Sequence, residues 1–108
     1  ISSMSEQPGQ GGGTAVATET KTKTKRPALY KVLLHNDDFT TMEFVVFILQ
    51  TIFHKNPIDA HAIMMAVHRA GVGVAGVYSY EIAEAKVNKV IDLAQANEFP
   101  LRCSIEEE

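Results

Sequence analysis

The chain has 108 residues, of which 45% are hydrophobic, and a formal net charge of −3 at pH 7. Residues 1–26 contain only five hydrophobic residues and carry four basic against two acidic side chains, a charge of +2, which leaves −5 for residues 27–108. A segment of this length supports one small core but not two, and its negative balance argues against general binding to nucleic acid or an anionic membrane.

The first 26 residues are predicted to be a flexible extension. Four glycines and a Thr/Lys alternation leave almost no apolar surface to offset the entropy of ordering this segment. Residues 1–3 precede Met4 and are interpreted as a cloning remnant. A solubilising tail without further function is the simplest alternative, and the folded domain is expected to span residues 27–108.

Cysteine content and hydropathy indicate the compartment. Cys103 is the only cysteine, which excludes an internal disulfide framework and a Cys-rich zinc site. No apolar run reaches the roughly 18 residues of a membrane span, and the first residues lack the basic-then-apolar order of a secretory signal. We therefore expect a cytoplasmic protein.

The first predicted elements are a strand and a helix. Residues 30–34 are apolar and β-compatible, and the polar residues 36–38 end the strand in a turn. Thr40 and Glu43 have the spacing of a capping box ahead of an apolar helix over residues 44–53. Apolar residues surround most of this helix, so we expect it to be buried on all sides.

Two more helices and two more strands are predicted downstream. Asn56 and Pro57 begin a helix that ends before Gly71. Residues 71–78 alternate Gly with Val and favour a second strand or extended loop. Ser79 begins a third helix, and a short strand over residues 101–105 follows Pro100. The order β-α-α-β-α-β predicts an α+β domain with three helices packed on a small three-stranded sheet.

The turn from Asn36 to Glu43 permits several chemistries. Asp37 and Asp38 could hold a hard metal or act as an acid/base pair, but the turn lacks the ligands and glycine of a calcium loop and no positioned nucleophile accompanies it. Carboxylate and amide oxygens could also accept hydrogen bonds from a cation. A turn that merely caps a helix is the simplest alternative, and local sequence favours it.

The second predicted helix adds candidate ligands. Met64, Val67 and His68 are spaced to share one side of it, and His61 precedes His68 by seven residues. Core packing explains Met64 and Val67 equally well when each is considered alone. A metal site at the two histidines would need ligands from elsewhere, so we expect neither a metal nor a cofactor.

Three motifs together resemble one family. Residues 36–45, Ile63-Met64 with Val67-His68, and residues 81–87 occur in the order typical of ClpS, the bacterial adaptor that recognises N-degrons. The resemblance covers about residues 28–107. It implies a non-enzymatic protein that binds the N-terminal peptide of a substrate and delivers it to the N-terminal domain of a ClpA-type AAA+ unfoldase working with ClpP.

The resemblance also implies roles for individual residues. Asn36, Asp38 and His68 are expected to hold the free α-amino group, and Glu81 and Lys86 to face the unfoldase. The extension up to Arg26 is expected to serve delivery rather than binding. The wall of a pocket for a bulky first side chain (Leu, Phe, Tyr or Trp) is expected to comprise Leu34, Asp37, Thr40, Met42, Val45, Met64, Val67 and Leu101.

Two residues depart from the family pattern. Thr41 stands where proline is common, and His35 where an apolar residue is common. His35 could alter the pocket rim or simply face solvent, so the two differences leave fine specificity open, whereas recognition of the amine is expected to be unchanged. The remaining alternatives are an interaction domain of the ribosomal-stalk type without a ligand pocket, and a small hydrolase or metalloprotein.

Overall fold

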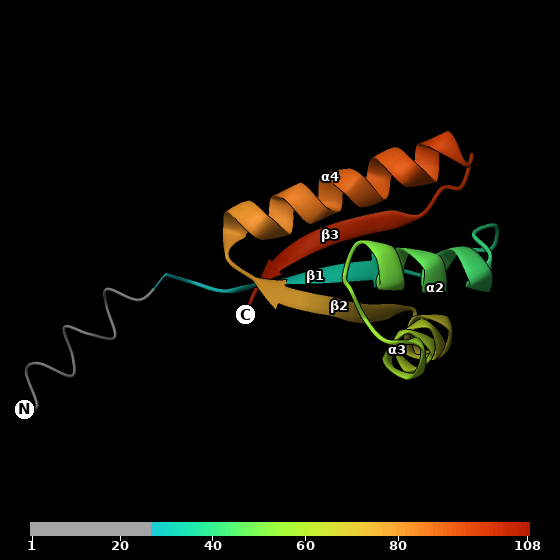
Figure 1. The fold of residues 1–108 in the computed structure, drawn as a ribbon, viewed down its shortest axis with the longest axis horizontal. Coiled ribbons are helices and arrows are strands. Elements are labelled where there is room, and N and C mark those ends of the chain that lie inside the picture. The colour runs from blue at the N-terminus through green and yellow to red at the C-terminus, as the bar shows by residue number, and fades with distance from the viewer. Residues whose placement is uncertain (1–26) are drawn as a thin grey trace, which may run out of the picture.

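The structure is a computed structural model and describes residues 27–108, so the extension expected at residues 1–26 lies outside the described residues. The observed order confirms the predicted α+β domain with three helices and a three-stranded sheet. Within residues 27–108, no helix is both long and apolar enough to cross a membrane. The elements are β1 (Tyr30–His35), α2 (Met42–Thr51), α3 (Pro57–Ala70), β2 (Val72–Tyr78), α4 (Tyr80–Ala96) and β3 (Arg102–Glu107) (Figure 1).

The sheet has the strand order β2-β1-β3, so the first strand of the described residues lies in the middle. Both neighbours run antiparallel to β1. Tyr30 lies opposite Tyr78 on β2 and opposite Glu107 on β3. The sequence alone did not determine this order, because each strand is joined to the next through helices.

The core lies between the helices and one face of the sheet. Val32 and Leu34 on β1 are 0% exposed, whereas the intervening Leu33 and the flanking Lys31 are only half-buried. This alternation is that of a strand with one covered face. The helices contribute most of the rest of a single buried cluster, namely Phe44, Val45, Ile48, Leu49, Ala60, Met64, Val67, Ala83, Val90 and Ala94.

The start of α2 corrects the predicted capping box. Thr41, not Thr40, occupies the N-cap, and its hydroxyl accepts a hydrogen bond from the Phe44 N–H at 3.1 Å. The Thr40 hydroxyl instead donates to the Asp37 carboxylate at 2.7 Å, and the Thr40 N–H bonds the same carboxylate. The helix therefore begins at Met42, and Thr41 replaces the expected proline with a side chain that stabilises the helix terminus.

The expectation that α2 is buried on all sides is wrong. Phe44, Val45, Ile48 and Leu49 are buried, but 47% of Phe47 is exposed. The helices form one layer on the sheet, so no further layer covers the outer side of α2 (Figure 1).

Hydrogen bonds join the end of β1 to the end of α3. The Asn36 N–H donates to the Gly71 carbonyl at 2.9 Å, and the Gly71 N–H donates to the Val67 carbonyl at 2.9 Å. Gly71 ends α3 in the left-handed conformation, with φ of 88°. The same residue thus terminates the helix and anchors the chain that leaves β1.

Replacing Gly71 tests this junction. Gly71→Ala is expected to lower the free energy of unfolding by about 1 kcal/mol, since a Cβ is disfavoured at positive φ. No atom lies within 4 Å of an added Cβ, so the loss arises from backbone conformation rather than from a clash. Gly71→Asn is the matched control and should lose less, because Asn tolerates this conformation better. Equal urea stability of wild type and Gly71→Ala would contradict the assignment.

Candidate functional site

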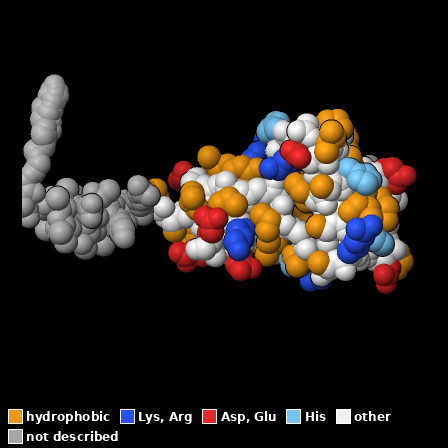
Figure 2. All heavy atoms as spheres, turned by 90° about the horizontal axis from the view of Figure 1, so that it is seen from below, with side chains coloured by type: hydrophobic (Ala, Val, Ile, Leu, Met, Phe, Trp, Pro, Cys, Tyr) orange, Lys and Arg blue, Asp and Glu red, His pale blue; other side chains and the backbone are white. Residues whose placement is uncertain are grey.

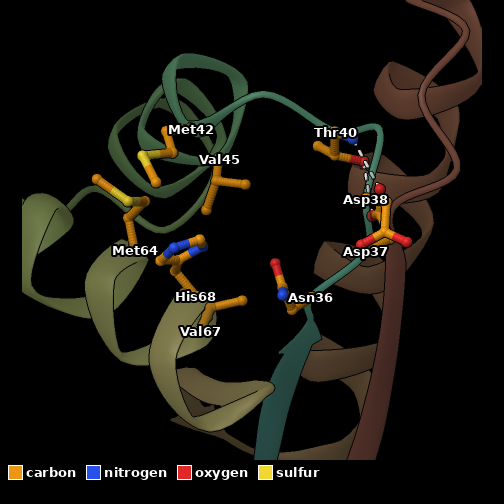
Figure 3. Close-up of a pocket in the computed structure, with 9 residues that line it drawn as sticks. All are labelled: Asn36, Asp37, Asp38, Thr40, Met42, Val45, Met64, Val67 and His68. Carbon is orange, nitrogen blue, oxygen red and sulfur yellow. Dashed lines mark hydrogen bonds between the residues drawn. The ribbon is translucent and has the colours of Figure 1, made fainter.

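A cavity of about 260 Å³ opens where the end of β1, the loop after it, α2 and α3 meet. Its volume is below the roughly 300–1,000 Å³ of pockets for drug-sized ligands, so it suits a group about the size of one side chain. The residues that line it are Asn36, Asp37, Asp38, Thr40, Met42, Val45, Met64, Val67 and His68 (Figure 3).

The pleat of β1 directs Asn36 toward this cavity. Successive side chains of a strand alternate between faces, so Asn36 is on the same side as the buried Leu34. Figure 3 shows the Asn36 side chain projecting into the space between the loop and the two helices. The cavity is therefore the polar continuation of the covered sheet face, beyond the point where strand pairing ends.

The helices supply the opposite wall of the cavity. Met64 and Val67 on α3 are buried, as is Val45 on α2, whereas His68 is exposed. Since residues three and four apart lie on one side of a helix, Met64 brings an apolar group beside the His68 imidazole. Figure 3 shows these side chains gathered on the helix side of the cavity, across from the loop.

Asp37 holds the loop in shape. Its carboxylate accepts hydrogen bonds from the Phe39 N–H at 2.8 Å, the Thr40 N–H at 2.7 Å and the Thr40 hydroxyl at 2.7 Å. Partial burial raises the pKa of Asp37, but the hydrogen bonds from Thr40 and Phe39 and the positive charge of Arg102 outweigh burial and lower the pKa below 3.8. Asp37 is thus a structural carboxylate that remains ionised.

Asp38 is arranged differently from its neighbour. It is exposed, and within residues 27–108 its carboxylate accepts no hydrogen bond from another side chain or backbone group. The same holds for the side chains of Asn36 and His68. An amide oxygen, a carboxylate and a neutral imidazole nitrogen are all acceptors, so the cavity can receive a cationic donor next to an apolar wall.

The site shows no metal-ligand cluster. Within the described part of the chain, no three or more His, Cys, Asp or Glu residues are close enough to hold an ion. His61 and His68 are both on α3, but seven residues of helix separate them by roughly 10 Å along the axis. The two histidines therefore cannot share one ion.

Every residue that lines the cavity was expected there from the sequence, but two expected wall residues do not line it. Leu34 is 0% exposed and Leu101 is 6% exposed, and both belong to the hydrophobic core. His35 does not reach the rim either: its Nε2 lies 2.7 Å from the Ser104 hydroxyl on the neighbouring strand. Alternation along β1 places His35 on the sheet face opposite Asn36.

The two residues expected at a partner interface have different environments on α4. Glu81 is exposed in the first turn. Lys86 is half-buried, and its ammonium donates to the Ile52 carbonyl at 2.7 Å and lies 5.2 Å from the centre of the Tyr78 ring. Burial, and next the charge of Lys89, lower the pKa of Lys86. Lys86 thus fastens α4 to the end of α2, a contact that the sequence did not indicate.

Comparisons with known proteins give a consistent picture. Residues 25–104 match the family model described as "ATP-dependent Clp protease adaptor protein ClpS". Proteins called ATP-dependent Clp protease adapter protein ClpS are similar to this chain in Desulfatibacillum aliphaticivorans (58% identity, covering 78% of this chain and 81% of that protein) and Caulobacter vibrioides (53% identity, covering 98% and 92%).

A solved structure is similar as well. Agrobacterium tumefaciens ClpS2 bound to L-phenylalaninamide is 41% identical to this chain, with a TM-score of 0.74. The match covers 77% of this chain and all of the other.

The different environments of the two adjacent aspartates lead to a stability prediction. Asp37→Ala should lower the free energy of unfolding at neutral pH by about 1 kcal/mol, because it removes charge-assisted hydrogen bonds at a partly exposed site. Asp38→Ala, the matched control, should change it by less than about 0.5 kcal/mol.

Acid should abolish this difference. The folded-state pKa of Asp37 is lowered, so its contribution is present above the ordinary value of 3.8 and is lost as the pH falls through the folded-state pKa. Urea unfolding at several pH values measures both effects. Equal losses for the two variants at neutral pH would show that Asp37 does not stabilise the loop.

Proposed function

The chain belongs to the ClpS family of adaptors of the ATP-dependent Clp protease, and from this membership we propose that its cavity binds the N-terminal residue of N-degron substrates. The free α-amino group is held by Asn36, Asp38 and His68, and the first side chain enters the apolar part. The observation that carries the proposal is the convergence of these three polar groups and an apolar wall on one cavity. An interaction domain without a ligand pocket has no use for that convergence.

The chemistry of the amine matches the polar side of the cavity. A primary ammonium has three donors and no acceptor, and the three groups offer an amide oxygen, a carboxylate and an imidazole nitrogen. The carboxylate of Asp38 also supplies a charge opposite to that of the ammonium, and charge-assisted hydrogen bonds are stronger than neutral ones. Acetylation of the amine removes both the charge and two of the three donors.

The apolar side of the cavity accounts for a bulky first residue. Met42, Val45, Met64 and Val67 would surround a Leu, Phe, Tyr or Trp side chain, whose burial contributes roughly 1.5–3 kcal/mol. Met42 is 43% exposed and narrows the entrance. A β-branched Val or Ile is stiff at its first torsion and would pass this narrow entrance poorly.

Delivery is the second half of the proposal. The bound substrate is passed to the N-terminal domain of a ClpA-type unfoldase acting with ClpP in the cytoplasm, and the adaptor itself performs no catalysis. Glu81 is exposed on α4, where it is accessible to such a partner. Lys86 would contribute through the position of α4, because its ammonium is already bound to the Ile52 carbonyl. A role of residues 1–26 in delivery stays a prediction.

Peptide binding tests the amine site. A peptide that begins with Phe should bind with low-micromolar or tighter affinity, and its N-acetylated form should bind at least about tenfold more weakly. Asp38→Asn should cause a similar loss, whereas Asp92→Asn, which removes the same charge from an exposed position of α4, should cause none. Fluorescence anisotropy measures these affinities. Equal binding of free and acetylated peptides would refute the proposed amine site.

Degradation assays test delivery separately from binding. Glu81→Ala should slow the degradation of a Phe-initiated reporter by unfoldase and ClpP by about threefold or more, which corresponds to the loss of one moderate polar contact. It should leave peptide affinity unchanged. Glu84→Ala is the matched control, since Glu84 is also exposed on α4. Equal degradation rates for both variants would show that Glu81 does not belong to the interface with the unfoldase.

A further inference from the structure

A second cavity, of about 350 Å³, lies directly beside the first. The two cavities share Met42 and Met64, which form the partition between them. Beyond this partition the second cavity is lined by Glu43, Val46, Phe47 and Gln50 of α2 and by His61 of α3. It is thus a largely apolar groove between the outer sides of the two helices.

The groove exposes apolar surface that the fold leaves uncovered. Phe47 is 47% exposed and Met42 is 43% exposed, although both are large hydrophobic residues. Figure 2, seen from the side on which α3 lies, shows hydrophobic and histidine side chains intermingled over this end of the molecule. A contiguous apolar surface next to a binding pocket is typical of an extended ligand site.

The spacing along α3 indicates which part of a ligand reaches the groove. His68 borders the first cavity and His61 the second, with Met64 between them. Seven residues of helix correspond to roughly 10 Å, about the length of the first three residues of an extended peptide counted from its amino group. Side chains one and three of an extended peptide also point to the same side, whereas side chain two points away.

We propose that this second cavity receives an apolar side chain at the third position of the N-terminal peptide whose first side chain fills the first cavity. The inference rests on the proposed function, because it takes the amino group to lie at His68, Asn36 and Asp38. Glu43 also borders the groove, so an acidic third residue is disfavoured by charge repulsion. The adaptor would then select substrates by two side chains rather than one.

Three peptides test the inference, two of which each differ from a common reference, Phe-Ser-Ser, at one position. Their N-terminal sequences are Phe-Ser-Leu, Phe-Leu-Ser and Phe-Ser-Ser, followed by one common tail. Partial burial of Leu at the third position should tighten binding about three- to tenfold over Phe-Ser-Ser. Leu at the second position should have a smaller effect. Equal affinities for all three, or a larger gain at the second position, would overturn the inference.

A pair of variants locates the effect. Phe47→Ala removes the ring from the groove without altering the lining of the first cavity, and it should abolish the preference for Leu at position three while Phe-Ser-Ser still binds. Ile58→Ala is the matched control: Ile58 is 81% exposed and lines neither cavity. A preference that survives Phe47→Ala, or that is lost in both variants, would place the third side chain elsewhere.

A measurement on the unmodified protein covers the case in which Phe47→Ala does not fold. The Phe-Ser-Leu peptide should shift the amide resonances of Phe47 and His61 more than Phe-Ser-Ser does, and equal shifts would contradict the inference. Failure of this inference is distinguishable from failure of the proposed function: if free Phe-Ser-Ser binds and its acetylated form does not, the amine site stands whatever the third residue does.

Discussion

The hydrogen bond from the Asn36 N–H to the Gly71 carbonyl is the constraint on which the site depends. It joins the last residue before the loop to the residue that ends α3. The segment that begins at Asn36 supplies the amide and carboxylate groups of the cavity. The end of α3 supplies the imidazole of His68. Together with the adjacent pairing of His35 and Val72, this link holds Asn36 and the end of α3 that carries His68 side by side.

The two aspartates of the loop have different roles: Asp37 stabilises the loop, and Asp38 offers a free carboxylate to the cavity. Asp37 uses its carboxylate to hold Phe39 and Thr40, whereas Asp38 borders the cavity and its carboxylate accepts no hydrogen bond from residues 27–108. Thr40 bonds Asp37, and the next residue, Thr41, caps α2 by accepting from the Phe44 N–H. One carboxylate therefore helps to shape the loop that leads into the helix, whereas its neighbour stays available to a ligand.

Local signals in the sequence were sufficient to predict the ends of an element wherever a single residue determines the backbone conformation there. Pro57 and Gly71 marked both ends of α3, and the Val/Gly pattern after it is a strand, as predicted. The nine cavity residues were also expected, through a resemblance to a family rather than through local physics. How deeply a residue is buried was harder to predict. Whether Leu34 lines a pocket or belongs to the core depends on how closely the helices approach β1.

Other features required knowledge of tertiary neighbours. The local pattern favoured Thr40 as the N-cap because Glu43 follows it at capping-box spacing, whereas in the structure Thr40 bonds the Asp37 carboxylate and Thr41 caps the helix. Phe47 belongs to an apolar helix, but its exposure depends on the number of layers in the fold. The contact between Lys86 and the Ile52 carbonyl joins residues 34 positions apart, and no spacing rule anticipates it. The groove beside Phe47 was missed for the same reason.

The central position of β1 has a consequence for biosynthesis. β1 is the first strand of residues 27–108 to leave the ribosome, and Tyr30 must wait for Glu107 before its second neighbour exists. At typical rates of translation this interval lasts roughly 4 to 15 seconds. During it, Val32 and Leu34 lie on a strand with at least one unpaired edge, a state prone to wrong pairing. The residues that line the cavity therefore all leave the ribosome before β3 completes the sheet.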